Sequence, residues 1–254
     1  MEDNGHVLAF MAHPDDTEFL CSGTLVRLKE KGYQIHLATM TAGDGGSMVM
    51  GPEEITRKRL LEAETAARRL GAVYLCAGEK DFTVCYQPET IRKAVEIVRH
   101  SRAFMVVTHS PVDYMPDHEI TSQLVCNACF CAGAPNMKTD ALPAARPLKG
   151  IPYLYYAAPL EGKDPFGRDV DLEFYVDVGK EMGEKEEMLK CHASQREWLL
   201  EHHGVDEYLD SMRRWSATAG ERGGMEFAEG FRQHRGHAYP QDNYLKKILE
   251  GKID

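Results

Sequence analysis

The segment Ala12–Glu18, with the sequence AHPDDTE, places one imidazole and three carboxylates within a few residues. A short apolar run, Val7–Ala12, leads into it, so the segment stands where a strand ends and a helix begins. In open α/β sheets, ligands bind at the carboxyl ends of the strands, and we expect these side chains to face a ligand site. Helix capping is the ordinary use of an aspartate at this position, but a cap needs only one carboxylate. His13 and Asp16, three residues apart across a tight turn, can instead converge on one cation.

A second polar segment, THSPVDYMPDH, ends at His118 and follows another apolar run, Ala103–Thr108. Parallel strands of one sheet bring the residues that follow them to the same edge, so the two segments can meet. A lone histidine at a helix start is more often an ordinary surface residue, and the prediction therefore depends on the combination. Two histidines and one aspartate suit zinc and leave a fourth position open for water. We predict that His13, Asp16 and His118 bind Zn²⁺, with Asp15 as general base for a zinc-activated water molecule.

Short β-branched runs alternate with amphipathic helical patterns, which is typical of a mostly parallel sheet flanked by helices. We expect an α/β, Rossmann-like fold, although the glycine fingerprint of dinucleotide-binding proteins is absent from the first turn. We expect one domain over residues 1–254, with a core of about residues 1–178 and a helical C-terminal extension of about residues 179–254. The expected strands are His6–Ala12, Gln34–Thr41, Val73–Cys76, Ala103–Thr108, Tyr153–Ala158 and Glu173–Val178, the last at an edge; the expected helices are Thr17–Lys31, Pro52–Leu70, Glu89–His100, His118–Ala132, Lys180–His203 and one beyond Gly204 that runs to about Ala219.

Composition argues against several classes of function. The formal net charge is −10, which disfavours nucleic acid as a partner because binding to phosphates relies on clustered Lys and Arg. The apolar runs are strand-sized, so we expect no membrane span. The N-terminus lacks the features of a secretory signal and the seven cysteines suit reduced thiols, so we expect a cytoplasmic protein. A homo-oligomer is compatible with the sequence but is not required by it.

Other features of the sequence disfavour two further classes of function. The loop Thr41–Ser47 is rich in glycine, but its spacing fits neither a P-loop nor a dinucleotide motif, which disfavours phosphate binding. No G-x-S-x-G motif occurs, which disfavours a serine hydrolase. Two pairs of histidines, His202 with His203 and His234 with His237, are expected at the surface.

The sequence resembles the zinc-dependent de-N-acetylase family typified by PIG-L and LmbE-like proteins. The family's opening motif, an apolar strand followed by A-H-P-D-D-x-E and a helix of small residues, corresponds here to MAHPDDTEFLCSGTLVRL. Its later P-x-D-Y-x-P-D-H segment corresponds to PVDYMPDH, and its R-x-x-E helix corresponds to Arg59–Gly71. KEEMLKCHASQ and AEGFR, nearer the C-terminus, are also similar to family segments, so the resemblance covers nearly the whole chain.

The resemblance implies the same zinc ligands and general base as the residues themselves indicate. It further implies that Arg59, on the helix after the second strand, and Asp81, in the loop after the third, contact the substrate. An ion pair between Arg59 and Glu62 on a solvated helix face is the alternative for Arg59. The implied reaction removes the acetyl group from an N-acetylated amino sugar or its conjugate, of the N-acetylglucosamine type, by attack of zinc-bound water on the amide.

One position departs from the family pattern. Many members carry a histidine three residues before the last ligand, where this chain has Met115, and a thioether cannot donate a proton. His109, His192 and Tyr114 are candidates to replace it, and Asp117 is a candidate to orient a metal ligand. Two alternatives therefore stay open: a non-catalytic or weakly active sugar-binding member of the fold, and an amidase that acts on another amide. The general base argues against the first, because a buried charge is costly to keep without a role.

Overall fold

The computed structural model describes residues 2–196 and 207–251. Within these ranges the strands are β1 (His6–Met11), β2 (Gln34–Thr41), β3 (Val73–Glu79), β4 (Met105–Thr108), β5 (Tyr153–Ala157), β6 (Phe174–Asp177) and β7 (Ala228–Gln233). The helices are α1 (Asp16–Leu20), α2 (Ser22–Glu30), α3 (Pro52–Leu70), α4 (Pro88–Ser101), α5 (Pro116–Cys131), α6 (Met182–Leu189), α8 (Glu207–Gly223) and α9 (Tyr244–Glu250), with a short 3₁₀ helix, η1, at Leu160–Gly162.

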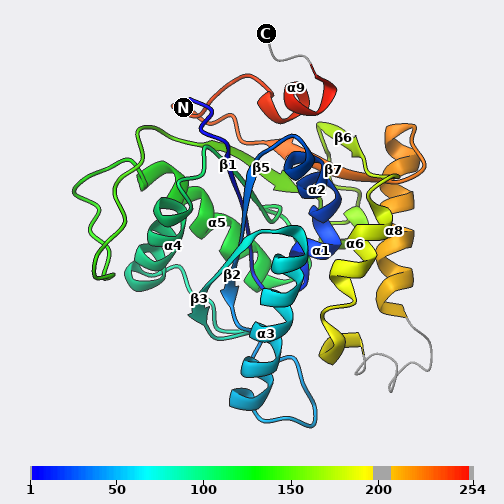
Figure 1. The fold of residues 1–254 in the computed structure, drawn as a ribbon, viewed down its shortest axis with the longest axis horizontal. Coiled ribbons are helices and arrows are strands. Elements are labelled where there is room, and N and C mark those ends of the chain that lie inside the picture. Colours follow the sequence, from blue (N-terminus) through cyan, green and yellow to red (C-terminus); the bar gives the residue numbers. More distant parts are fainter. Residues whose placement is uncertain (1, 197–206, 252–254) are drawn as a thin grey trace.

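All seven of these strands join one sheet in the order β3-β2-β1-β4-β5-β7-β6 (Figure 1). The strands from β3 to β5 in this order are parallel, whereas β7 runs antiparallel to both β5 and β6. The predicted α/β fold with a mostly parallel sheet flanked by helices is confirmed. β1 lies between β2 and β4, so the order of the chain reverses there, and such a switch point is where open α/β sheets bind ligands.

Helices cover both faces of the sheet, as the alternation of side chains along β1 shows. Val7, Ala9 and Met11 belong to one apolar core, which α2, α6, α8 and α9 also line. Leu8 and Phe10 belong to the other, which is closed by α4 and α5 (Figure 1). Because successive side chains of a strand point to opposite faces, a strand with a core on each face must be apolar throughout. This explains the continuous apolar run that precedes the first polar segment.

The helix predicted at Thr17–Lys31 is divided into α1 and α2. Cys21, between them, has φ −151° and ψ 4°, which is not helical. The backbone N–H groups of Gly23 and Thr24 donate hydrogen bonds of 2.9 and 2.7 Å to the carboxylate of Glu229. A carboxylate at the N-terminus of a helix satisfies orphan donors and complements the helix dipole. The break is therefore stabilised by a residue from β7, which a local pattern cannot reveal.

The segment predicted as a helical C-terminal extension contains helices α6, α8 and α9, but it also supplies β7. This correction has a local cause, because Glu229 and Gly230 interrupt the alternation that marks a strand. A Cβ on Gly230 would lie 2.5 Å from a methyl carbon of Leu172, so the glycine permits close packing. β7 separates β5 from β6, which lies at the edge of the sheet as predicted. The helix predicted at Lys180–His203 is interrupted: α6 ends at Leu189, residues 190–192 form a turn, and residues 193–196 are helical again. Residues 197–206, with His202 and His203, lie outside the described ranges.

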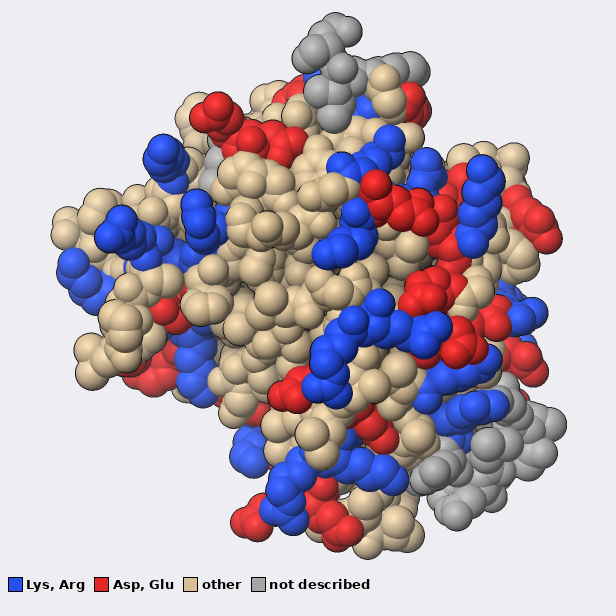
Figure 2. Space-filling model, in the orientation of Figure 1, with Lys and Arg blue, Asp and Glu red and all other residues tan. Residues whose placement is uncertain are grey.

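The surface carries both signs of charge. On the face in Figure 2, Lys and Arg side chains are interspersed with Asp and Glu. No helix in residues 2–196 and 207–251 has the length and apolar character needed to cross a membrane.

Candidate active site

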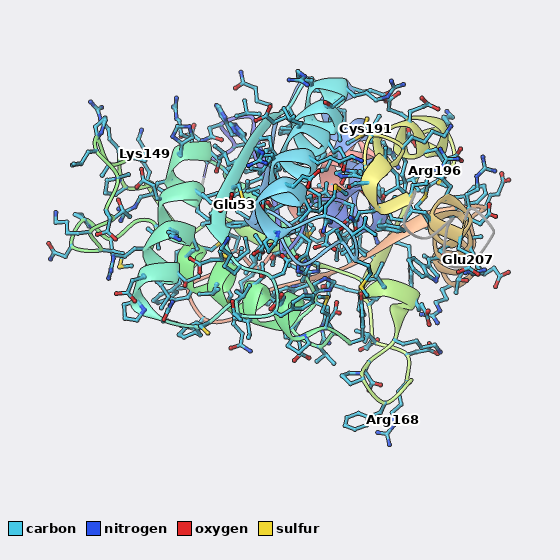
Figure 3. The ribbon with its side chains drawn as sticks, turned by 90° about the horizontal axis from the view of Figure 1, so that it is seen from below. Glu53, Lys149, Arg168, Cys191, Arg196 and Glu207 are labelled. Atoms are coloured by element: carbon cyan, nitrogen blue, oxygen red, sulfur yellow. The ribbon has the colours of Figure 1, made fainter. Side chains whose placement is uncertain are left out.

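The turn after β1 holds Asp15 in a left-handed conformation, with φ 98° and ψ −24°. This backbone region is strained for a residue with a side chain, and such residues cluster at functional sites. The turn directs Asp16 back toward β1, where its Oδ2 accepts a hydrogen bond of 2.7 Å from the backbone N–H of His13. α1 has no side-chain cap, so neither aspartate is used as an ordinary helix cap. Figure 3 looks onto this end of the molecule from below, with the first turns of α3 and α8 marked by Glu53 and Glu207.

His13, Asp16 and His118 converge, although His118 comes from the start of α5. His13 Nδ1 lies 3.4 Å from Asp16 Oδ2, and His118 Nε2 lies 3.5 Å from Asp16 Oδ1. Neighbouring ligand atoms of a tetrahedral zinc site, with bonds of about 2.0–2.1 Å, are roughly 3.3 Å apart. All three residues are buried, and one donor atom from each lies within 4.8 Å of the others. The donor set therefore fits a cation of the size of zinc.

Two further carboxylates fix the imidazole rings. Asp113 Oδ1 lies 3.0 Å from His118 Nδ1, which leaves Nε2 of His118 directed to Asp16. Asp117 Oδ2 lies 3.3 Å from His13 Nε2, which leaves Nδ1 of His13 for the centre of the site. Carboxylates in these positions hold the tautomer and orientation of histidines that bind metals. The sequence indicated this role for Asp117 but not for Asp113.

The charges of the site are arranged for a cation. Burial disfavours a charged imidazole, yet hydrogen bonds with Asp117 and Asp16 raise the pKa of His13 to about 10. Burial also disfavours a charged carboxylate, yet His118 and His109 hold the pKa of Asp16 well below its usual range. Asp16 is therefore ionised, and its carboxylate favours positive charge at the place where the three donors meet.

Asp15 lies beside these donors, and both of its carboxylate oxygens have partners. Nη2 of Arg59 lies 3.3 Å from Asp15 Oδ1, and the hydroxyl of Tyr208 donates a hydrogen bond of 2.6 Å to Asp15 Oδ2. Burial raises the pKa of Asp15 in spite of the guanidinium nearby, which makes its carboxylate a stronger base than an exposed aspartate. Sequence reasoning missed Tyr208, because only the packing of α8 against the first turn brings these residues together.

Arg59 does not form the ion pair with Glu62 that was the alternative for it. Glu62 instead accepts hydrogen bonds from N and Oγ of Ser194, at 2.9 and 2.6 Å. Arg59 is 4% exposed, and its Nη2 donates a hydrogen bond of 2.5 Å to the carbonyl oxygen of Pro14. Its Nη1 lies 3.5 Å from the carbonyl oxygen of Gly43. The guanidinium thus links the turn that carries the aspartates to the glycine-rich loop.

Asp81 reaches the site from the loop after β3. Its Oδ2 accepts a hydrogen bond of 2.8 Å from the N–H of Gly45. Its Oδ1 lies 4.0 Å from His13 Nε2 and is buried without a hydrogen-bond partner among the described residues. A Cβ on Gly45 would lie 2.3 Å from the ring of Phe82, so glycine is needed for the loop to pack here. Asp81 therefore has one carboxylate oxygen available to a ligand.

His109 and His192, two of the three candidates for the role of the family histidine that Met115 replaces, are both buried. His109 Nε2 accepts a hydrogen bond of 2.9 Å from the N–H of Ala12, and its ring stacks on that of His118 with centroids 3.9 Å apart. A second group with suitable spacing for a metal, His109, Asp113 and His118, shares His118 with the first, and its His109 Nε2 is already engaged by the backbone. His192 is 1% exposed, with Nε2 3.4 Å from Glu18 Oε2.

Tyr114, the third candidate, lies on the open side of the site. Its ring meets that of His118 edge-on, with centroids 5.6 Å apart, and 57% of its surface is exposed. Partial burial and the nearby carboxylates of Asp16 and Asp113 raise the pKa of Tyr114, so the phenol keeps its proton at neutral pH. Of the three candidates, Tyr114 is thus the one that a bound substrate can reach.

Comparison with known proteins agrees with this fold. The chain is 25% identical over 238 residues to the diacetylchitobiose deacetylase of Thermococcus kodakarensis, which is 89% of this chain and 82% of that protein. Its fold is similar to that of N,N'-diacetylchitobiose deacetylase from Pyrococcus horikoshii, with a TM-score of 0.77, 23% identity, and coverage of 94% of this chain and 88% of that chain.

The same fold also occurs in a different type of enzyme. GalB, the 4-carboxy-2-hydroxymuconate hydratase from Pseudomonas putida KT2440, superposes with a TM-score of 0.75 and 19% identity over 93% of this chain and 98% of that chain. Likeness to these structures shows the fold alone, because one fold can carry several activities. Residues 8–129, which include the AHPDDTE and PVDYMPDH motifs, match the family model described as PIG-L: GlcNAc-PI de-N-acetylase. This part of the chain is therefore similar to the PIG-L family.

Proposed function

We propose that this protein is a zinc-dependent amide hydrolase that removes the acetyl group from an N-acetylated amino sugar or its conjugate. The observation that carries this proposal is the convergence of His13, Asp16 and His118 beside a carboxylate, Asp15, that does not belong to the donor set. The named activity of the Thermococcus relative on diacetylchitobiose supports a substrate of the N-acetylglucosamine type.

The donor set would hold the metal through two imidazole nitrogens and one carboxylate. This combination suits zinc better than calcium or magnesium, which prefer oxygen ligands only. When bound, zinc acts as a Lewis acid that polarises a carbonyl and lowers the pKa of a coordinated water to about 7. Asp113 and Asp117 keep the two rings in the orientation that this binding requires.

Asp15 accepts the proton of the attacking water in this proposal. Its raised pKa makes it a suitable base near neutral pH, and Arg59 and Tyr208 keep its carboxylate in place. A base that is held at both oxygens loses little conformational entropy when the substrate binds. The substrate-binding role implied for Arg59 stays a prediction, and its contacts with Pro14 and Asp15 favour action through the base.

Tyr114 would act on the substrate from the open side of the site, and Asp81 from its buried side. The protonated phenol of Tyr114 can donate a hydrogen bond to the leaving amine or to the developing oxyanion, the work that Met115 cannot do. The unpartnered Oδ1 of Asp81 can accept a hydrogen bond from a sugar hydroxyl. The expected cytoplasmic location and the question of a homo-oligomer stay predictions.

Release of free amine from N-acetylglucosamine and N,N'-diacetylchitobiose, by protein of measured zinc content, tests the proposal. We expect activity in the zinc-loaded protein, loss of both zinc and activity in His13→Ala, and retention of zinc with a roughly 10²- to 10⁴-fold lower kcat in Asp15→Asn. Full activity of Asp15→Asn would remove this residue as the base. Bound zinc without turnover of any acetamide would instead favour the non-catalytic alternative.

A further inference from the structure

An aromatic groove runs along the outer side of α5, beyond the metal donors. Its walls come from the loops after β3 and β4, from α5, from β5 and from the segment after β7, and its aromatic lining consists of Tyr86, Phe130, Tyr156 and Tyr239. The groove has a volume of about 550 Å³. Ligand pockets have volumes of roughly 300–1,000 Å³, so this groove has room for more than one sugar ring.

The groove is lined without formal charge. None of the described residues that line it is Lys, Arg, Asp or Glu, although these types make up 28% of the chain. Burial lowers the pKa of His234, so this imidazole in the wall is neutral at pH 7. An anionic or cationic ligand would therefore lose its hydration without gaining a counter-ion. These properties select for an uncharged ligand.

Hydrogen bonds fix the aromatic rings in place before a ligand arrives. Tyr239 donates from its hydroxyl to the carbonyl of Cys126 at 2.7 Å, and Asn127 Nδ2 donates to the hydroxyl of Tyr86 at 2.6 Å. The hydroxyl of Tyr156 lies 2.8 Å from His234 Nδ1. Rings that are already ordered bind a ligand at a low cost in entropy.

The groove also offers exposed rings and polar groups that are not engaged. Phe130 is 56% exposed and Tyr86 is 53% exposed, and exposed apolar surface of this kind marks sites of interaction. The side chains of Gln123 and His237 make no hydrogen bond with any residue of the described ranges. Flat apolar rings combined with free amide and imidazole groups suit a ligand that has C–H faces and hydroxyl edges, which is the character of a neutral saccharide.

The groove begins next to the candidate active site. Ser122, in its wall, donates from Oγ to the carbonyl of His109 at 2.8 Å, one helical turn beyond His118. Pro111, also in its wall, begins the loop that leads to Tyr114 and His118. We propose that this groove binds the uncharged saccharide part of the substrate beyond the acetamido sugar, so that the enzyme prefers oligosaccharides to single sugars. This inference depends on the proposed function.

Kinetics with N-acetylglucosamine and its β-1,4-linked tetrasaccharide test the inference, with Phe130→Ala as the variant. Phe130 follows His118 by twelve residues on α5, or about 18 Å, so a chain longer than a disaccharide is needed to reach both. Leu61→Ala is the matched control, because Leu61 is an equally exposed apolar residue (62% against 56%) on α3 and does not line the groove. We expect wild type and Leu61→Ala to show a higher kcat/KM for the tetrasaccharide, and Phe130→Ala to lower that preference by roughly 3- to 10-fold through KM. Binding of the tetrasaccharide measured by calorimetry should weaken by the same factor.

The outcomes separate this inference from the proposed function. Turnover of both sugars with equal kcat/KM in wild type, or an unchanged preference in Phe130→Ala, would contradict saccharide binding in the groove and leave the proposed hydrolase activity intact. Sugar binding that depends on Phe130, without any turnover, would contradict the hydrolase activity and support saccharide binding in the groove. If calorimetry detects no sugar binding, the proposed role of the groove is wrong. Sedimentation velocity on the same proteins tests the other occupant: if Phe130→Ala alters the oligomeric state and not the affinity for the tetrasaccharide, the groove is an interface between copies of the chain.

Discussion

The hydroxyl of Tyr208 can be removed without loss of volume, which isolates its hydrogen bond to Asp15. This bond is 2.6 Å long and joins the buried Tyr208 to Asp15, whose side chain is 14% exposed. A hydrogen bond to a charged group contributes about 1.5–3 kcal/mol, and the Tyr208→Phe variant leaves Asp15 Oδ2 without this donor. We therefore expect the free energy of unfolding of Tyr208→Phe to fall by about 2 kcal/mol.

The same change should act on the reaction, because the freed carboxylate can turn away from the position in which it accepts a proton. We expect kcat to fall roughly tenfold or more, with KM changed less than about twofold, since a misplaced base affects the reaction more than binding. Steady-state kinetics on an acetamido sugar and urea unfolding of the same protein give both quantities.

Tyr153→Phe is a matched control for this experiment. Tyr153 also donates to a carboxylate, that of Asp242, at 2.8 Å, but it lies on β5 away from the site. It should lose some stability and keep its kcat. If Tyr208→Phe loses stability and keeps kcat as the control does, Tyr208 only holds α8 in place and the role that we assign to it is wrong.

Three further changes have defined outcomes. Asp113→Ala removes the partner of His118 Nδ1, and we expect zinc affinity, measured by competition with a chromophoric chelator, to fall roughly 10- to 100-fold. Lys185→Met removes the cation from a buried ion pair with Glu229, and the uncompensated carboxylate should cost about 3–5 kcal/mol in urea unfolding, whereas an unchanged midpoint would contradict the pair. Burial lowers the pKa of His36 from 6.5 to about 4. Between pH 4 and pH 6.5 the unfolded chain therefore binds a proton at His36 that the folded chain does not bind. The contribution of His36 to the free energy of unfolding is complete above pH 6.5 and decreases as the pH falls toward 4. His36→Gln should therefore reduce the loss of stability between pH 7 and pH 5 by about 1 kcal/mol, a value discounted for partial solvation, and equal losses in both proteins would reject this.

The core of the fold and the centre of the site follow from local sequence. β1, β2 and β4 are apolar on both faces, and parallel order brings their carboxyl ends to one edge. That is why the sequence predicts that His13 and His118 lie close together. Asp117, next to His118, contacts His13 in the structure, although the two are 104 positions apart in the chain.

The parts that were not predicted depend on contacts between distant segments. Asp15 and Tyr208 are 193 residues apart, and Glu229 is 206 residues from Gly23, whose N–H it accepts. No periodicity in β7 or α8 announces such partners, because a tyrosine or glutamate that serves a distant site looks like any other polar residue of its element. The assignment of Arg59 is an intermediate case: its helix was predicted, but only the packed structure shows which of its possible partners it takes.

The carboxylate of Glu229 at the start of α2 ties the first turn of the site to a part of the chain that is synthesised much later. The candidate donors His13, Asp16 and His118 all precede the end of α5. Glu229 at α2 and Tyr208 at Asp15, which hold the turn between these donors, follow from β7 and α8. During synthesis, the donors of the proposed site are therefore complete before the groups that fix the turn around them.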